Sequence, residues 1–253
     1  MKRLAALALL ALAACGEGAP ASKITKAQTC ETQVFEASRF THCTIDPARD
    51  TIELVLDGRG GQPLRSFADL ESHVPEDRLV LAMNAGMFDD AGQPVGLLVV
   101  DGRERHAINR NDGPGNFHLQ PNGVFSGSGK DWRVETTDAY AARDAKSAFA
   151  TQSGPMLVID GKLHPDFAED SESRHFRNGV GVDAKRLVHF VISDDLVSFG
   201  KFARFFRDAA KTPDALYLDG AVSQLWAPEI GRRDGGPPLG PLIVVTKPAK
   251  AEE

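Results

Sequence analysis

The sequence predicts an α+β fold: one domain built on a large mixed or antiparallel β-sheet, with several hairpins and few helices. Residues 78–88 form a nearly continuous apolar run, which is typical of a central strand covered on both faces. Strand-like segments recur in pairs around short turns, and only two stretches have a helical pattern. Because no break in composition follows residue 30, we expect residues 30–247 to form a single domain, followed by a disordered tail at 248–253.

The first 14 residues read as a secretory signal, because Lys2 and Arg3 precede an apolar run too short to span a membrane with flanks. The run ends in Leu-Ala-Ala-Cys, which resembles a bacterial lipoprotein signal whose Cys15 becomes the acylated N-terminus. Ordinary signal-peptidase cleavage, with Cys15 incidental, is the alternative. Residues 15–29 are small and polar and read as a tether. We therefore expect a lipid-anchored protein on the periplasmic side of the bacterial envelope, held at the outer membrane.

Two further cysteines, Cys30 and Cys43, favour a disulfide outside the cytoplasm. The segment between them has two β-rich halves around Ala37-Ser38, so a hairpin would bring its ends together. Two free buried thiols are the alternative. A zinc site is not favoured, because no further ligands follow at zinc-site spacing.

The remaining elements follow in order. Residues 50–58 alternate between apolar and polar, as a half-buried strand does. Hairpins are predicted at 94–109, 153–164 and 178–193, with turns at Asp101-Gly102, Asp160-Gly161 and Asp183-Ala184-Lys185. Helices are predicted over the Ala-rich stretch 137–147 and over 198–210, where four phenylalanines share one stripe and Ser198 is the expected N-cap.

Several function classes are disfavoured. The net charge is −6 and no basic stripe is visible, which argues against nucleic-acid binding. The motifs GxxxxGK[ST], HExxH, GxSxG and CxxC do not occur. Residues 179–184 fit GxGxxA, but they lead into a hairpin instead of a helix, so a dinucleotide site is not predicted.

Polar residues and glycines gather at the predicted strand ends, and Asp219 stands out among them. It follows the apolar residues Leu216, Tyr217 and Leu218, so it should be partly desolvated and need partners or a raised pKa. Gly220 beside it would leave room for a ligand to approach. The other strand ends also have plainer readings: Asn-Gly and Asp-Gly pairs as turns, arginines as surface charges.

Five segments carry a resemblance to a known family: "MNAGMF", "GNFHLQPNGVF", "QSGPMLVIDGKLHP", "RNGVGVD" and "ALYLDGAVSQLW". In this order and spacing they resemble the phosphodiester glycosidase domain family, in its bacterial branch, over roughly residues 41–246. The resemblance implies a mixed α+β domain and hydrolysis of a sugar-1-phosphodiester. Ala221 departs from the pattern, because the family usually has glycine there. "GNFHLQPNGVF" is typical of the bacterial branch.

On this reading Asp219 faces the sugar as nucleophile or general base, and Arg177 clamps the phosphate. Asp183 would pair with Arg177 or share a cation with Asp219. The expected substrate-binding residues, including backbone donors at three glycines, are Asn84, Gly86, Asn122, Gln152, Ser153, Gly154, Gly220 and Ser223.

The sequence assigns no definite cofactor and leaves Ca²⁺ or Mg²⁺ open. Oxygen ligands suit Ca²⁺ or Mg²⁺, but no spacing demands either ion. The expected partner is a sugar-phosphate or glycan small molecule, with the membrane reached only through the N-terminal lipid. Two other readings remain open. One is a non-catalytic lipoprotein that binds envelope glycans or a protein partner, and the other is a hydrolase of another ester with His118 or His175 as base.

Overall fold

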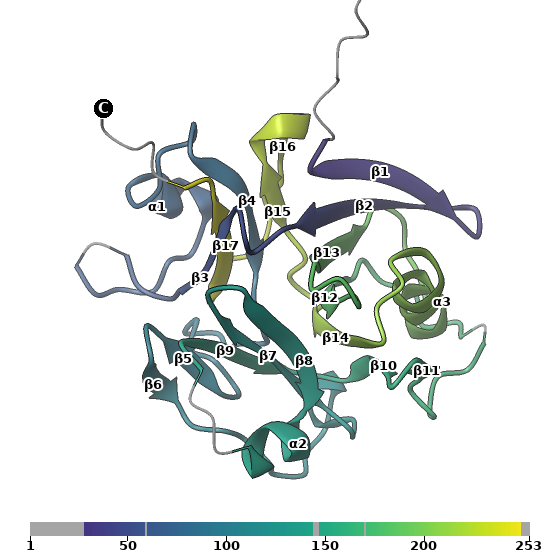
Figure 1. Ribbon diagram of the computed structural model, residues 1–253. Helices are drawn as coiled ribbons and strands as arrows, with labels where there is room; N and C mark the ends of the chain where they lie inside the picture. The colour runs from purple at the N-terminus through teal and green to yellow at the C-terminus, as the bar shows by residue number, and fades with distance from the viewer. Residues whose placement is uncertain (1–27, 59, 144–146, 170, 249–253) are drawn as a thin grey trace, which may run out of the picture.

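The computed structural model describes residues 28–58, 60–143, 147–169 and 171–248 (Figure 1). The predicted signal peptide, the predicted lipidation site Cys15, most of the predicted tether and most of the predicted C-terminal tail lie outside these residues. Within the described part of the chain, no helix is both long and apolar enough to cross a membrane.

The strands form three sheets, and all their pairings are antiparallel. The first sheet has the order β1 (Cys30–Phe35), β2 (Ser38–Ile45), β13 (Val188–Ser193), β12 (Asn178–Val182), β14 (Asp214–Asp219), β10 (Met156–Ile159), β11 (Lys162–Leu163). The second has the order β16 (Arg232–Arg233), β15 (Leu225–Ala227), β4 (Leu79–Asn84), β17 (Leu242–Thr246), β3 (Thr51–Val55). The third has the order β6 (Arg103–His106), β5 (Leu98–Val100), β9 (Phe149–Ser153), β7 (Gly123–Ser128), β8 (Asp131–Thr136).

The predicted α+β class with mainly antiparallel strands is confirmed. The strands are divided among three sheets, whereas the sequence suggested one large sheet. The three predicted hairpins form as β5–β6, β10–β11 and β12–β13. Asp101 and Asp160 adopt φ of 50° and 47°, and the glycine after each also has positive φ. This is the conformation that two-residue hairpin turns require.

Short helices cover the sheets. The two predicted helical stretches contain α2 (Thr137–Ala142) and α3 (Phe199–Arg204), and α3 continues into the π-helical η2 (Phe205–Ala209). The predicted cap is present, since the Ser198 side chain accepts a hydrogen bond from Lys201 N–H. The helix α1 (Phe67–Glu71) was not predicted, and the 3₁₀ helices are η1 (Asn116–His118) and η3 (Pro228–Ile230).

The phenylalanine stripe of the second predicted helix packs onto the seven-stranded sheet. Phe202, Phe205 and Phe206 are fully buried in one cluster with Phe40 of β2 and Tyr217 of β14. Figure 1 shows α3 on the outer side of this sheet. A larger apolar cluster joins residues from all three sheets on the opposite side. This double covering explains why β12, β13 and β14 are apolar along most of their length.

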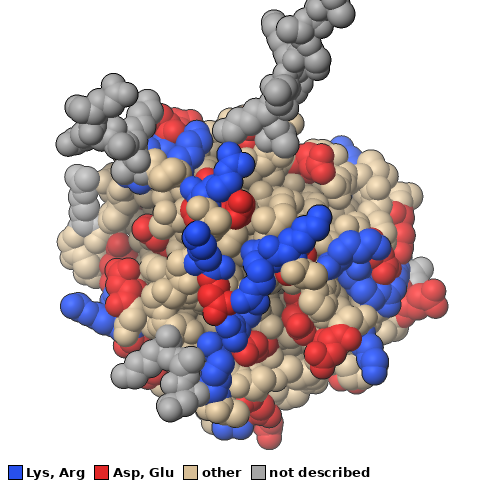
Figure 2. All heavy atoms as spheres, viewed as in Figure 1, with Lys and Arg blue, Asp and Glu red and all other residues tan. Residues whose placement is uncertain are grey.

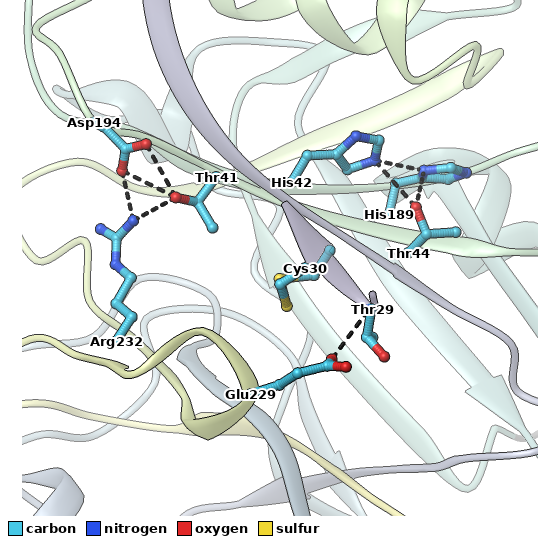
Figure 3. The surroundings of a disulfide bond; sticks show 10 residues. Thr29, Cys30, Thr41, His42, Thr44, His189, Asp194, Glu229 and Arg232 are labelled. Atoms are coloured by element: carbon cyan, nitrogen blue, oxygen red, sulfur yellow. Dashed lines mark hydrogen bonds and ion pairs between the residues drawn. A yellow bond between two sulfur atoms is a disulfide. The ribbon is translucent and has the colours of Figure 1, made fainter. Parts of the chain in front are cut away.

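Cys30 and Cys43 face each other across β1 and β2 and form the predicted disulfide (Figure 3). The two-residue turn between these strands is Glu36-Ala37, one residue earlier than the sequence suggested. Beside the bridge, the Thr29 N–H donates to Glu229 Oε2 over 3.0 Å, which fixes the start of the described chain against η3.

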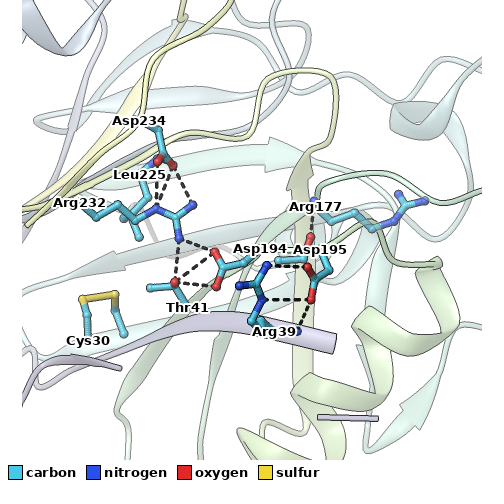
Figure 4. A network of polar contacts seen from close by, with 11 residues as sticks. Cys30, Arg39, Thr41, Arg177, Asp194, Asp195, Leu225, Arg232 and Asp234 are labelled. Carbon is cyan, nitrogen blue, oxygen red and sulfur yellow. Dashed lines mark hydrogen bonds and ion pairs between the residues drawn. A yellow bond between two sulfur atoms is a disulfide. The ribbon is translucent and has the colours of Figure 1, made fainter. Parts of the chain in front are cut away.

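An ion-pair network ties the first sheet to the second (Figure 4). Arg232 of β16 bonds to Asp234 and reaches across to Thr41 of β2 and Asp194, which follows β13. All the charged groups in it are largely buried, with side-chain exposures of 19% to 27%. Such partly desolvated, multiply bonded pairs contribute more to stability than exposed ones.

On the molecular face shown in Figure 2, Lys and Arg side chains lie among Asp and Glu side chains. A diagonal band of basic side chains crosses the centre of this face, and acidic groups flank it. Oppositely charged side chains also form ion pairs, such as Arg204–Glu36 at 2.7 Å. This face is therefore not uniformly basic.

Candidate functional site

Asp219 lies at the very end of β14, where the strand leaves the core. Its side chain is buried, and the whole residue is only 7% exposed. Oδ1 accepts three main-chain N–H groups: those of Gly220 (2.6 Å), Ala221 (2.9 Å) and Val222 (3.4 Å). The loop after the strand therefore folds back over the carboxylate, and this local turn is a well-known use of aspartate.

Burial raises the pKa of Asp219 to about 6, while the three main-chain amides act in the opposite direction. Burial wins because removing a carboxylate from water penalises its charged form. A carboxyl group with this pKa is mostly ionised at pH 7 and yet able to take a proton. Such a group suits nucleophilic or general-base chemistry near neutral pH.

Asn178 is the central partner of this strand end, and our sequence reading missed it. It is fully buried at the start of β12, directly opposite Asp219. Its Oδ1 accepts the Asp219 N–H over 2.9 Å, and its Nδ2 donates to Asn84 O and Oδ1 over 3.2 and 3.1 Å. Asn178 stands in the segment "RNGVGVD", between Arg177 and the predicted strand, so the sequence shows it as one more polar residue at a strand end.

Asn84 and Ser223 complete what we call the polar cluster, namely Asn84, Asn178, Asp219 and Ser223. Asn84, at the end of β4, accepts the Gln224 N–H over 3.0 Å. Ser223 donates its hydroxyl to Asp219 O over 2.9 Å. The ends of β4, β12 and β14, from two different sheets, therefore meet at one place, as the sequence led us to expect of Asn84, Asp219 and Ser223.

Arg177 precedes Asn178, and its guanidinium is turned to the other face of β12. It is 1% exposed and lies 3.6 Å from the centroid of the Phe199 ring. Nε and Nη2 donate to the main-chain oxygens of Val197 and Ser173, and among the described residues buried Nη1 has no hydrogen-bond partner. Burial lowers the pKa of Arg177. With two of its nitrogens committed to the main chain, it is poorly placed for the bidentate phosphate clamp we expected.

Tyr217 connects the arginine with the aspartate loop. The Arg177 guanidinium lies 5.5 Å from the centroid of its ring. Burial raises the pKa of Tyr217, an effect that the charge of Asp219 strengthens and that of Arg177 opposes. A Cβ added at Gly220 would fall 1.8 Å from the Tyr217 hydroxyl oxygen. The space at Gly220 is thus taken by this hydroxyl and not left for a ligand.

Ser153, Gly86 and Gly220, which were predicted to bind substrate, make hydrogen bonds within the protein. Ser153 donates its hydroxyl to Leu218 O over 2.6 Å and receives the Met87 N–H at 3.4 Å. The Gly86 N–H is engaged by Thr151 Oγ1 over 3.1 Å, and the Gly220 N–H by Asp219 itself. These two glycine donors are therefore occupied within the protein and do not face a phosphate.

Gln152 and Asn122 belong to a separate cluster on β7 and β9. Gln152 is 1% exposed and uses both ends of its amide, with Oε1 accepting from Leu97 and Asn109 N–H. Thr137 links the two amides, accepting from Gln152 Nε2 and donating to Asn122 Oδ1. Here the structure supports a framework role and not the predicted contact with substrate.

Gly154 packs close to that second cluster. A Cβ there would fall 2.7 Å from both Asn122 Cβ and Phe117 O. Asn122 and Thr137 also line an open cavity of about 520 Å³ that includes Arg110 and Asp112. Gly154 thus serves packing beside this cavity.

Asp183 lies at the opposite end of β12 from Asn178, in the hairpin turn before β13. Its Oδ1 accepts the Lys185 and Leu187 N–H groups, and its Oδ2 lies 3.4 Å from His189 Nε2. The five residues of β12 separate it from Arg177, so the two residues are about 20 Å apart along the extended chain. The expected pairing with Arg177, or a cation shared with Asp219, does not fit this geometry.

The two histidines of the alternative hydrolase reading make main-chain contacts. His118 Nδ1 donates to Asn111 O over 2.8 Å, and exposed His175 pairs through its backbone with Val197. Among the described residues, no group of three or more His, Cys, Asp or Glu side chains is placed to hold a metal ion. A larger cavity, of about 1000 Å³, lies elsewhere, lined among others by Thr44, Asp46 and Glu229.

Comparisons with known proteins bear on this arrangement. A family model described as phosphodiester glycosidase matches residues 77–240, which include the whole polar cluster. The Escherichia coli (strain K12) protein YigE, itself uncharacterized, is 29% identical over 187 residues, which is 72% of each chain.

Two solved structures share the fold. The zebrafish N-acetylglucosamine-1-phosphodiester alpha-N-acetylglucosaminidase catalytic domain, auto-inhibited by its pro-peptide, matches with a TM-score of 0.59 and 14% identity. The match covers 87% of this chain and 82% of that one. A hypothetical protein from Synechocystis matches with a TM-score of 0.55 and 13% identity, over 87% of this chain and 61% of the other.

Proposed function

Because the chain belongs to the phosphodiester glycosidase family, we propose that it hydrolyses a sugar-1-phosphodiester, with Asp219 as its catalytic carboxylate. The single observation that carries the assignment is a buried carboxylate, held by three main-chain amides at a strand end, whose pKa is raised to about 6. Buried, perturbed carboxyl groups of this kind are typical of active sites.

The proposed reaction breaks the bond between the anomeric carbon and the phosphate oxygen. Positive charge develops on the sugar ring, and the departing phosphomonoester carries negative charge. Because phosphate is a good leaving group, little acid assistance is needed. Asp219 acts in one of two ways. As a nucleophile it attacks the anomeric carbon, and water later hydrolyses the glycosyl-enzyme to release the sugar. As a general base it takes a proton from the water molecule that attacks the anomeric carbon.

The polar cluster orients this carboxylate. Asn178 holds the Asp219 N–H, Ser223 holds its carbonyl, and Asn84 joins both strands to β4. Arg177 acts indirectly. Its buried guanidinium lies near the Tyr217 ring, and its charge adds positive potential near the end of β14. The phosphate is then bound by groups other than a direct Arg177 clamp.

The test uses a nucleotide sugar such as UDP-N-acetylglucosamine and a nitrophenyl phosphodiester of a sugar 1-phosphate, each with and without chelator. We expect the wild-type protein to release free sugar, and Asp219→Asn to lose turnover by at least about a thousandfold. Asp214→Asn is the matched control, because Asp214 lies on the same strand and burial also raises its pKa. Asp219→Asn turnover at the wild-type rate would reject the assignment. Sugar-phosphate binding without turnover would support a binding protein instead.

We also propose that the chain is anchored in the bacterial envelope through Cys15. The signal-like N-terminus and the Cys30–Cys43 disulfide support this, since such bridges persist in oxidising compartments. Cys15→Ala should abolish incorporation of labelled palmitate and release the protein into the soluble periplasmic fraction. Equal labelling of Cys15→Ala and wild type would contradict the anchor.

A further inference from the structure

Phe176 is an exposed aromatic residue between buried polar ones. Its exposure is 49%, whereas Arg177 and Asn178, which follow it, are 1% and 0% exposed. Val34 and Leu196 are the other large apolar side chains that are well exposed in the described part of the chain. A single exposed apolar side chain is normal on a protein surface, so what bears on function is where Phe176 lies.

That position is beside the Asp219 loop. A Cβ at Gly220 would fall 3.3 Å from Phe176 O, so the backbones at Phe176 and Gly220 lie against each other. The chain before β12 is already extended, because His175 bridges to Val197 and Arg177 O accepts the Ser193 N–H. Phe176 therefore continues the line of β12 past the end of β14.

Strand alternation gives the direction of its ring. The Arg177 side chain turns to Phe199 and Tyr217, whereas that of Asn178 turns to Asn84. Since side chains alternate along extended backbone, the Phe176 side chain leaves the chain on the side opposite to that of Arg177. An exposed aromatic residue therefore lies against the loop that folds over the candidate catalytic carboxylate.

We propose that Phe176 is the platform on which the sugar ring of the substrate stacks, and hence a specificity-determining residue. The proposal rests on the proposed function. A pyranose has one face of C–H groups, and an aromatic ring offers the flat apolar surface that matches it. The ring then selects substrates with a sugar at the phosphodiester and contributes to binding in both ground and transition states.

The kinetic test compares Phe176→Ala, Phe176→Trp and the control Leu196→Ala, which also removes an exposed apolar side chain. With the nucleotide sugar we expect Phe176→Ala to raise KM roughly five- to tenfold, with kcat nearly unchanged, because uniform binding is lost. Phe176→Trp should keep KM near wild type. Leu196→Ala should leave both kcat and KM near their wild-type values.

A binding test separates this proposal from the proposed function. Calorimetry measures binding of N-acetylglucosamine 1-phosphate to Asp219→Asn and to Asp219→Asn/Phe176→Ala. A roughly five- to tenfold weaker Kd in the double variant supports the platform even if Asp219 proves not to be catalytic. Equal Kd values, or an equal rise in KM in Phe176→Ala and Leu196→Ala, would overturn it.

Discussion

Asn178 Oδ1 accepts the main-chain N–H of Asp219 over 2.9 Å, so one buried amide fixes the strand end that carries the candidate catalytic carboxylate. The same amide donates to Asn84 at the end of β4. One side chain thus joins the seven-stranded sheet to the second sheet exactly where the polar strand ends meet.

Replacing Asn178 with Ala should lower the free energy of unfolding by about 2–4 kcal/mol, because buried partners on both strands lose their hydrogen bonds. Urea denaturation at pH 7 measures the change. Ser223→Ala is the milder comparison, with a loss of about 1 kcal/mol, since it removes one good bond, to Asp219 O. Equal, small losses in both variants would argue against the central place of Asn178.

Sequence reasoning reached Asp219 because an acid after an apolar strand is locally anomalous. It reached Asn84 and Ser223 through the same argument about strand ends. It missed Asn178, and it misjudged Arg177, because the sheet decides which side each residue faces. In "RNGV" the Arg177 side chain packs against Phe199 of α3, whereas the Asn178 side chain bonds to Asn84 in the polar cluster. The sequence pattern alone does not show which of the two side chains faces which side.

Asp219 should make both activity and stability depend on pH between about 4 and about 6. Its folded-state pKa is higher than its unfolded value, so the folded protein binds the proton more tightly. The contribution of Asp219 to stability therefore falls by about 3 kcal/mol as pH rises through this window. Activity changes in the opposite direction, since kcat/KM requires the ionised form and should be half-maximal near pH 6 and level off above about pH 7. Asp219→Asn should remove this stability change, and urea titrations at several pH values measure it.

The His42–His189 pair should act on stability with the opposite sign. A hydrogen bond of 2.8 Å joins the two rings (Figure 3). His189 lies 3.4 Å from Asp183, and Phe205 packs on His42. Burial and the neighbouring ring lower the pKa of His42 to about 4.

The folded protein therefore binds this proton less tightly than the unfolded chain, and stability is lost as pH falls from about 6.5 to about 4. Between pH 7 and pH 5 the loss should be about 2 kcal/mol. His42→Gln should flatten the acid side of the stability profile, whereas Asp219→Asn should steepen it. Parallel profiles for both variants would refute the opposed assignment.

The turn chemistry of the fold was readable from the sequence, whereas its partition into sheets was not. Asp101-Gly102 and Asp160-Gly161 are local signals, and both turns formed as predicted. Which strands pair across long separations, such as β3 with β17, depends on packing of many apolar faces at once. Several alternative pairings satisfy the same apolar pattern, so one large sheet and three smaller ones were equally consistent with it.

The Arg232 network, which joins the first sheet to the second, should contribute measurably to the free energy of unfolding. Arg232→Ala leaves Asp194 and Asp234 without their guanidinium partner in a largely buried setting, so we expect a loss of about 2–4 kcal/mol (Figure 4). Arg39→Ala is the control, because the Arg39–Asp195 pair is exposed and should contribute little. Chemical denaturation compares the two, and an equal effect would show that burial does not set the strength of these pairs.

The Glu36-Ala37 turn offers a stabilising change. Both residues have positive φ, 46° and 57°, although neither is glycine. The L-alanine side chain makes this conformation unfavourable, and glycine adopts it freely. Ala37→Gly should therefore raise the free energy of unfolding by about 0.5–1 kcal/mol, after allowance for the greater freedom of glycine in the unfolded chain. Ala139→Gly, within α2, is the matched control and should cost about 1 kcal/mol, because helix geometry already suits alanine. Opposite signs for one chemical change at two sites would show that backbone conformation decides the effect, and a loss at both positions would contradict it.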